Sequence, residues 1–334
     1  MDILNALVAV LNFIIVPGLA YGAQLALGAL GVTLIYGILR FSNFAHGDTM
    51  ALGTAFCILL TWGLQALGIG LGPLPTALLA LPVAIALTAG VALATDRLVY
   101  RHYRRLRVQP IVMVMVSVGV MFVMNGATRL LIGVGEIRFD DGVRFIISVR
   151  GFREWSGLTE GLALRGTQVL TIVTAIVTMA WLFWFLGRTR SGKAMRAYSD
   201  NEDLALLSGI DPERVVRLTW IIAMGLATIA GTLYGLDKTF KAFNYFQILL
   251  PIFAAAIVGG LGSPVGAIVG GFVVAFSEIA VTYPWKKVAA YLGYESSGLL
   301  QLLSTEYKFA VSFIILIVVL LFRPTGLFRG KAAT

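Results

Sequence analysis

The amino-acid sequence predicts an all-α polytopic membrane protein with about eight to ten transmembrane helices. The chain of 334 residues is 58% hydrophobic and only 13% charged, whereas a soluble domain carries about 25% charged residues. Its apolar runs are continuous for about the 20 residues that a membrane-spanning helix needs. They do not alternate with period two, as the strands of a membrane β-barrel would.

About ten apolar segments follow one another along the chain. They occupy residues 3–16, 19–39, 49–68, 76–100, 110–134, 166–187, 215–236, 247–259, 266–284 and 307–322. The first and the eighth are short for a complete span, so they can be tilted, interfacial or broken. No connecting segment reaches the roughly 50 residues that a separate soluble domain needs. We therefore expect residues 1–334 to form a single transmembrane domain.

Basic residues predict how the chain is oriented. Lys and Arg are more frequent in the segments that a ten-span arrangement starting inside places in the cytoplasm, as cytoplasmic loops require. We therefore expect the N-terminus and the C-terminus to be cytoplasmic, and residues 135–165 to lie outside. The cluster RHYRRLR at residues 101–107 is the strongest single signal. Asp2, in a first segment without basic residues, argues against a cleaved signal peptide.

The stretch GRTRSGKA at residues 187–194 nearly matches the phosphate-binding loop G-x-x-x-x-G-K-[ST] of nucleotide hydrolases. Such a loop follows a buried strand and places Ser or Thr after the lysine. Here an apolar span precedes the stretch, and Ala194 follows Lys193. The sequence therefore argues against nucleotide hydrolysis by this chain.

The next residues, YSDNEDLALLSGIDPERV, predict a short helix in a polar loop. Ser199 is expected as its N-cap with Glu202 three residues later, which is the pattern of a capping box. Gly209 stands where a left-handed C-cap belongs. The helix would present an apolar surface, which either a partner protein or the rest of the chain covers. That surface is formed by Leu204, Ala205, Leu206 and Leu207.

The segment FSNFAHGD at residues 41–48 interrupts two apolar runs. Non-helical polar backbone survives at membrane depth only when it is buried in protein or lines a cavity, and broken helices form transporter sites. One interpretation is a substrate pathway or gate, with His46 and Asp48 sharing a hydrogen bond. The other is a tight cytoplasmic turn in which Asp48 caps the next helix. The pathway candidates are Ser42, Asn43, Phe44, His46, Gly47 and Asp48.

A second interruption, GGLGSPVGAIVGG, begins at residue 259. Gly259, Gly260 and Gly262 permit turns and a close approach of helices, and Pro264 can begin the next helix. The alternative to a pathway role for these glycines is small-residue helix packing.

Glu278 lies in an apolar span, where an acidic residue is a functional candidate. It can equally form a hydrogen bond to a neighbouring helix or pair with Arg129. No nucleophile and base stand together in the sequence, and two ligands without a third do not make a metal site. We therefore expect neither an enzyme nor a metal protein.

Four segments in this order resemble the permeases of branched-chain amino acid ABC importers. They are GALGVTLIYGILRFSNFAHGDTMALGTAF, RSGKAMRAYSDNEDLALLSGID, AAAIVGGLGSPVGAIVGG and RPTGLF. Residues 43–47 spell the N-F-A-H-G signature of one type of these permeases. The resemblance extends from about residue 18 to residue 328.

This resemblance implies an all-helical permease of the larger ABC importer type in a bacterial inner membrane. Its implied substrates are branched-chain or other hydrophobic amino acids, with urea, short amides or aromatic acids as alternatives within the family. It also implies a second related permease, two cytoplasmic ATPases that bind the ATP, and an extracytoplasmic solute-binding protein. We expect no cofactor in this chain and no nucleic-acid partner. A stand-alone secondary carrier or channel is the alternative from another class.

Residues 188–214 match the family's cytoplasmic coupling loop, whose short helix docks in a cleft of the ATPase. The resemblance therefore assigns ATPase coupling to this segment. The expected coupling residues are Arg196, Ser199, Asp200, Glu202, Leu204, Ala205, Leu207 and Gly209.

Overall fold

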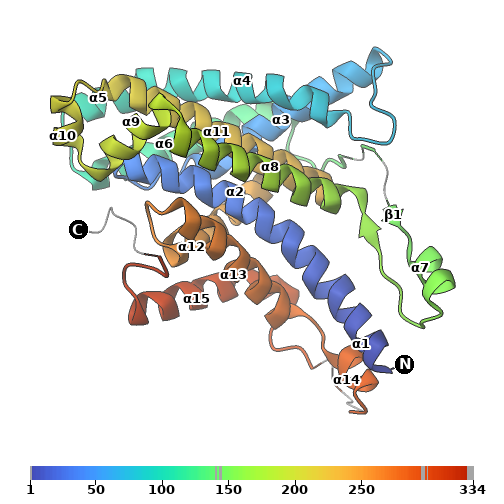
Figure 1. Ribbon diagram of the computed structural model, residues 1–334. Helices are drawn as coiled ribbons and strands as arrows, with labels where there is room; N and C mark the ends of the chain where they lie inside the picture. The colour runs from blue at the N-terminus through green and yellow to red at the C-terminus, as the bar shows by residue number, and fades with distance from the viewer. Residues whose placement is uncertain (1, 140, 143–144, 295–297, 299, 329–334) are drawn as a thin grey trace.

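The computed structural model describes residues 2–139, 141–142, 145–294, 298 and 300–328. Most of the described chain is helical (Figure 1), and within it nine helical stretches are long and apolar enough to cross a membrane. The only sheet in this part is a two-stranded antiparallel pair, β1 and β2. The expected all-α polytopic architecture is therefore confirmed.

The elements have the following bounds. They are α1 Asp2–Val10, a π turn Leu11–Ile15, α2 Val16–Leu39, α3 His46–Ala66, α4 Ala77–Thr95, a π turn Asp96–Tyr100, α5 Arg101–Arg105, α6 Pro110–Ile132, β1 Phe145–Ile147, α7 Val149–Ser156, β2 Leu164–Arg165, α8 Gly166–Arg188, α9 Arg190–Asp200, α10 Glu202–Leu207, α11 Pro212–Asp237, α12 Ala242–Gly259, α13 Pro264–Thr282, α14 Lys286–Tyr291, a 3₁₀ turn Thr305–Tyr307 and α15 Lys308–Phe322.

The first two expected segments form one continuous helical stretch, Asp2–Leu39. A π turn joins α1 to α2 just before Pro17. Proline lacks an N–H and its ring crowds the preceding turn, and a π turn absorbs that disturbance without ending the helix. The expected break between the two segments therefore does not occur.

The two described ends of the chain lie at opposite ends of the helical bundle (Figure 1). Helix α1 packs against α14, whereas the described C-terminal end lies at the opposite end of the bundle with α5, α9 and α10 (Figure 1). The expectation that both ends are cytoplasmic stays a prediction, and this arrangement makes opposite sides of the membrane its alternative. We call the end that carries α5, α9 and α10 the basic end, and the other the outer end.

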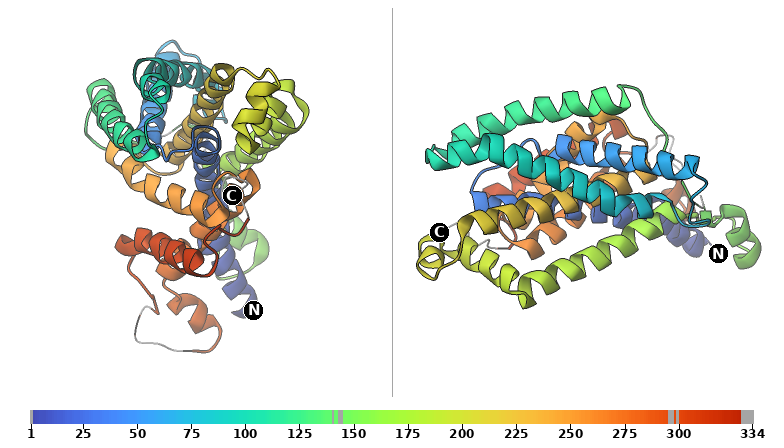
Figure 2. Two further views of the ribbon diagram at one scale, coloured as in Figure 1. Left: turned by 90° about the vertical axis from the view of Figure 1, so that its left-hand side faces the viewer. Right: turned by 90° about the horizontal axis from the view of Figure 1, so that it is seen from above.

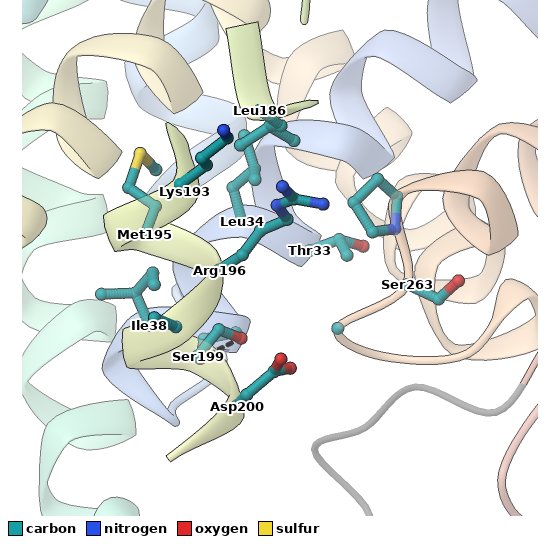
Figure 3. A pocket seen from close by; sticks show the side chains of 14 residues that line it. Thr33, Leu34, Ile38, Leu186, Lys193, Met195, Arg196, Ser199, Asp200 and Ser263 are labelled. Carbon is teal, nitrogen blue, oxygen red and sulfur yellow. Dashed lines mark hydrogen bonds between the residues drawn. The ribbon is translucent and has the colours of Figure 1, made fainter. Parts of the chain in front are cut away.

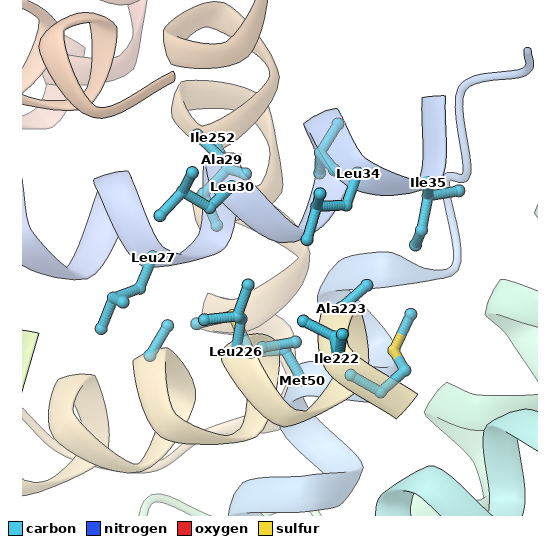
Figure 4. Packing of buried hydrophobic residues seen from close by; sticks show 14 of the residues in the cluster. Leu27, Ala29, Leu30, Leu34, Ile35, Met50, Ile222, Ala223, Leu226 and Ile252 are labelled. Carbon is cyan, nitrogen blue, oxygen red and sulfur yellow. The ribbon is translucent and has the colours of Figure 1, made fainter. Parts of the chain in front are cut away.

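Helix α2 runs through the middle of the bundle, as the view onto the basic end shows (Figure 2). It packs against α8, α11, α12 and α13 and is apolar all round, as expected of a fully buried helix. Leu30 and Ile35 of α2 and Leu226 of α11 are at most 2% exposed, and they belong to the packed cluster of Figure 4. Helix α13 approaches so closely that a Cβ on Gly271 would lie 2.7 Å from Cα of Ala26.

At the outer end, one buried carboxylate joins three segments. Glu160 accepts hydrogen bonds from Nζ of Lys287 (2.9 Å) and Oη of Tyr291 (2.5 Å) in α14. Its own N–H donates to Oδ1 of Asn5 in α1 at 3.2 Å. Residues 145–165 are thereby held against both α1 and α14.

Candidate functional site

The FSNFAHGD segment turns back into the protein core. Helix α2 ends at Leu39 with Arg40 in the left-handed conformation (φ 56°). A Cβ on Gly31, two turns before the end of α2, would lie 2.7 Å from Cε1 of His46. Helix α3 therefore begins deep beside α2, and not at its end. Asn43, His46 and Asp48 are each at most 3% exposed.

The irregular backbone of this segment finds its hydrogen bonds in other helices. The N–H of Phe44 donates to Oγ of Ser117 in α6 at 3.1 Å. Oδ1 of Asn43 accepts from the N–H of Ala45 at 3.2 Å and from Oη of Tyr100 at 3.1 Å. This is how polar backbone persists inside a membrane protein.

His46 and Asp48 do not share the expected hydrogen bond. Asp48 Oδ1 instead accepts from Nδ2 of Asn125 in α6 at 2.6 Å, and its other oxygen has no partner in the described chain. Neither ring nitrogen of His46 meets hydrogen-bond geometry there, although the ring lies beside the backbone of Gly28. Asp48 does not cap α3 either, because the N-cap is Ala45 and no side chain bonds there.

The remaining members of the segment contact α12. A Cβ on Gly47 would lie 2.8 Å from the carbonyl oxygen of Tyr245, so only glycine fits. The rings of Phe44 and Phe253 lie 5.2 Å apart, and Ser42 is half-buried. The motif thus joins α2, α6, α12 and the π turn Asp96–Tyr100 at one buried point.

The glycine-rich second interruption is a tight turn between α12 and α13. A Cβ on Gly259 would lie 2.0 Å from the carbonyl oxygen of Gly266, and Gly260 and Gly262 have φ of 109° and 84°. Pro264 begins α13 as expected, and Ser263 caps it by accepting from the N–H of Gly266 at 3.1 Å. Close packing requires glycine at position 259, and the left-handed conformation favours it at positions 260 and 262; a pathway role for these glycines stays a prediction.

The RPTGLF tail folds onto this same turn. The N–H groups of Leu327 and Phe328 donate to the carbonyl oxygens of Val258 (2.8 Å) and Gly259 (3.0 Å). Gly326 has φ of 79°, and a Cβ there would lie 2.6 Å from Cα of Gly260. Two motifs that are far apart in sequence therefore form one structural unit at the basic end.

Glu278 is 1% exposed and accepts a short hydrogen bond from Oγ of Ser312 in α15. Tyr21 and Lys308 are its other polar neighbours, and Nζ of Lys308 lies 5.3 Å from the centre of the Tyr21 ring. The positive charge of Arg129 interacts with the carboxylate of Asp48, and Arg129 is not a partner of Glu278. Of the alternatives, a hydrogen bond to a neighbouring helix is the one that the structure contains.

The expected single coupling helix is two helices with a break at Asn201. Oδ1 of Asn201 caps α10 by accepting from the N–H of Leu204 at 2.9 Å. Ser199 lies inside α9 and donates to the carbonyl oxygen of Gly37 at 3.1 Å, so the expected capping box of Ser199 and Glu202 is wrong. Gly209 has φ of 79°, which confirms the left-handed C-cap.

The capping-box prediction failed because both side chains are bonded elsewhere, Ser199 to α2 and Glu202 to α9. Glu202 accepts from Oη of Tyr198 at 2.6 Å. Burial raises the pKa of Tyr198 above its ordinary value, and this hydrogen bond raises it further, so the phenol stays a neutral donor at pH 7. Nη2 of Arg40 donates to the carbonyl oxygen of Ser199 at 2.6 Å. Helix α9 is therefore fastened to the end of α2.

The apolar surface of α10 is open to the outside of the chain. Leu204 and Leu207 are 61% and 85% exposed, whereas Ala205 is 4% exposed and faces inward. Arg196, Asp200 and Glu202 are exposed nearby at the same end. The rest of the described chain therefore does not cover these leucines.

Comparison with known proteins gives a family. The family model described as branched-chain amino acid transport system / permease component matches residues 14–320. The chain belongs to this family. It is a permease subunit of the ABC importer type, and the family is one of transport permeases, not of enzymes.

Curated relatives match the permease over almost its whole length. The high-affinity branched-chain amino acid transport system permease protein LivH of Escherichia coli (strain K12) is 28% identical over 313 residues, which cover 93% of this chain and 92% of the relative. BraD of Pseudomonas aeruginosa is 29% identical and covers 94% of each chain. A probable LivH of Methanocaldococcus jannaschii is 29% identical over 95% of this chain and 92% of its own.

The permease has a hollow of about 540 Å³ at its basic end, between α2, α9 and the α12–α13 turn (Figure 3). Three expected coupling residues, Arg196, Ser199 and Asp200, line it together with Gly262. The structure thus brings together members of the coupling group and of the glycine turn, which the sequence placed in separate groups.

Sequence reasoning missed the residues that hold these elements in place. Asp96, which is 4% exposed, accepts from Nε1 of Trp220 at 2.8 Å and pairs with Arg104 at 2.5 Å. Asn125, Ser117 and Tyr100 were also missed. Each is a single polar residue within or at the end of an apolar run, which is the only signal that could have marked it.

Proposed function

We propose that this permease moves branched-chain or other hydrophobic amino acids across the bacterial inner membrane. It does so together with a second related permease and an extracytoplasmic solute-binding protein. The observation that carries the proposal is the match to relatives named for branched-chain amino acid transport, over more than nine-tenths of both chains. The basic end is then cytoplasmic, in keeping with the positive-inside rule.

Two cytoplasmic ATPases supply the energy in this proposal and bind all of the ATP, so this chain needs no cofactor and catalyses no reaction. Their docking surface is the coupling segment 188–214, in which α10 presents Leu204 and Leu207 to the outside. An apolar surface on a polar loop is what a partner cleft covers. Ser199 and Arg40 bond α9 to α2. A displacement of α9 and α10 by the ATPases is therefore transmitted to α2, the central helix.

The substrate pathway in this proposal passes the buried junction at Asn43, His46 and Asp48 and the polar group at Glu278. Both contain buried polar atoms without partners in the described chain, namely the His46 nitrogens, one Asp48 oxygen and one Glu278 oxygen. Such atoms are costly unless another group or another conformation satisfies them. A transported zwitterion or its water would supply that partner.

The decisive test is uptake of labelled leucine by cells with and without this permease, challenged by excess valine, urea or benzoate. Loss of leucine uptake, with valine alone competing, supports the proposal. Unchanged leucine uptake, with loss of urea or benzoate uptake, would reassign the substrate within the same family. Purification in mild detergent without any co-purifying ATPase would favour a stand-alone carrier.

A further inference from the structure

The hollow at the basic end has two chemically different walls (Figure 3). Its volume of about 540 Å³ lies within the range of about 300–1,000 Å³ that is usual for small-molecule sites. The apolar wall consists of Leu34 and Ile38 from α2 and Leu186 from α8. The other wall is the inner face of α9.

That face of α9 carries the charge. Lys193, Arg196 and Asp200 all line the hollow, and their spacing of three and four residues places them on one face of a helix. In the described chain, neither Lys193 nor Arg196 forms a side-chain hydrogen bond or a salt bridge. Two cations and one carboxylate therefore border the space.

A buried hydroxyl faces the same space. Thr33 is 1% exposed and borders the hollow, and its Oγ1 has no hydrogen-bond partner in the described chain. The N-terminal end of α13, a helix of 19 residues, borders the space through Ser263 and Pro264. A helix N-terminus favours negative charge. Cations, an unused hydroxyl and a helix N-terminus all suit a carboxylate.

We propose that this hollow is a cytoplasmic exit site that binds the carboxylate of a hydrophobic amino acid before its release. Arg196 and Lys193 bind the carboxylate, Thr33 donates to it, and Leu34, Ile38 and Leu186 contact the apolar side chain. The proposal rests on the proposed function and deepens it. Asp200 also borders the hollow, and its carboxylate disfavours an anionic headgroup such as that of phosphatidylglycerol, which carries no positive group.

The position of α9 gives this site a role in coupling. One face of α9 lines the hollow, and the following α10 presents the leucines that an ATPase would contact. If nucleotide binding in the ATPases displaces α9, the positions of Lys193 and Arg196 in the wall of the hollow change with it. Substrate release and the ATPase cycle would then both depend on the position of α9.

The test uses a single reporter thiol in the complete importer, reconstituted with its ATPases exposed. The native Cys57 is buried, so Ala197→Cys, which is exposed and lines the hollow, provides a reporter for a thiol reagent. Gln109→Cys, exposed at the same end outside the hollow, is the control. We expect millimolar leucine to slow labelling at position 197 at least threefold, and leucinamide, which lacks the carboxylate, to have no effect.

Three further substitutions, each added to the Ala197→Cys reporter, identify the side chains that bind leucine. Adding Arg196→Gln to the reporter chain should abolish protection by leucine, and Thr33→Val, which keeps the shape of the side chain, should weaken it severalfold. Arg190→Gln neutralises a cation of α9 that does not line the hollow, and it should leave protection unchanged. Equal protection in all three variants would overturn the proposal.

Using 4-methylpentanoate, which shares the carboxylate and the tail of leucine, separates this proposal from the proposed function. If cells take up leucine but neither compound slows labelling, the exit site is wrong and the transport function stands. If leucine uptake does not depend on the permease but 4-methylpentanoate protects, the carboxylate site stands and the cargo is another apolar acid. The labelling rate at position 197 could instead fall with increasing phosphatidylglycerol in the vesicles and not respond to leucine. That result would assign the hollow to a lipid headgroup and overturn the proposal.

Discussion

At the scale of single residues, Asn43 shows how one side chain can stabilise a non-helical turn inside an apolar bundle. Its Oδ1 receives two hydrogen bonds, one from its own turn and one from Tyr100. The sequence marked this segment as polar but could not name the partner, because Tyr100 is 57 residues away. Contacts at such separations depend on how helices pack, and no local pattern encodes them.

Replacing Asn43 by alanine should lower uptake without releasing the ATPases. The change leaves two buried donors unpaired, which costs about 1–3 kcal/mol for each group, and it loosens the junction where α3 begins. Tyr100→Phe removes only one of the two bonds and should have the smaller effect. Uptake and ATPase co-purification are measured on the same membranes, and normal uptake by Asn43→Ala would make the motif purely structural.

Gly259→Ala should destabilise the permease, because its Cβ would lie 2.0 Å from the carbonyl oxygen of Gly266. Overpacking of this kind costs about 1–3 kcal/mol. Gly126→Ala, in α6, is the matched control because nothing lies within 4 Å of its added methyl group. Thermal unfolding in detergent, followed by tryptophan fluorescence, should show a lower midpoint for the first variant only. Equal midpoints would contradict the close packing of α12 and α13.

At the scale of elements, the coupling segment shows where local signals succeed and where they fail. Gly209 ends α10 in the left-handed conformation, as its residue type predicts. The predicted start of the helix was wrong because Asn201 is the N-cap of α10 and the Ser199 hydroxyl donates to the carbonyl oxygen of Gly37 in α2. A cap can be recognised locally only when no tertiary partner competes for the same side chain.

Leu207→Glu should weaken ATPase binding or uncouple ATP hydrolysis from transport, while insertion stays normal. Leu207 is 85% exposed, so the change places a charge on the docking surface without disturbing the interior. Leu67→Glu, at an exposed leucine (76%) near the outer end, is the control for the same chemical change. ATPase co-purification and leucine-stimulated hydrolysis are the measurements. If ATP hydrolysis stays fully coupled to transport in the Leu207 variant, α10 is not part of the ATPase interface.

At the scale of the whole molecule, the π turn before Pro17 decides which sides the ends of the chain occupy. Because α1 and α2 form one helical stretch, the described chain has nine candidate spans. From this odd number we predict that its ends lie on opposite sides of the membrane. The sequence showed two apolar segments and a proline between them. A proline ends a helix in most contexts, and only the continuous packing of this stretch reveals the exception.

Thiol labelling in spheroplasts tests this arrangement directly. Asp2→Cys and Gln109→Cys are both exposed positions, at the outer and the basic end respectively. An impermeant reagent should label the first in intact spheroplasts and the second only after permeabilisation. Protection of both residues until permeabilisation would restore a cytoplasmic N-terminus.

The carboxylate of Glu160 makes the outer end sensitive to acid. Burial alone would raise the pKa of Glu160, but the hydrogen bonds and the charge of Lys287, together with Tyr291, hold it below its ordinary value. A lowered pKa means that its contribution to stability is complete above the ordinary carboxyl range of about 4. That contribution is lost as the pH falls through the lower, folded value.

The protection factors of the amides in residues 145–165, which are exchange rates normalised to the intrinsic rate at each pH, should therefore fall on acidification below about pH 4. Glu160→Gln should exchange faster already at pH 7 and lose this acid-dependent step. Glu154→Gln is the control, since Glu154 is paired only with the neighbouring Arg150 and its side chain is 66% exposed. The same acid-dependent step in wild-type and Glu160→Gln protein would exclude this carboxylate as its cause.

The sequence by itself determined the fold class, the approximate positions of the spans and the family. These follow from long apolar runs, from charge concentrated in the loops and from motifs in a fixed order, all of which can be read along the chain. The tertiary structure alone decided that Asp48 bonds to Asn125 and not to His46, that the C-terminal tail seals the glycine turn, and that Arg196 shares a hollow with Thr33. These contacts join residues that are far apart in sequence, and they form only because helix packing brings the few polar groups of an apolar bundle to one another.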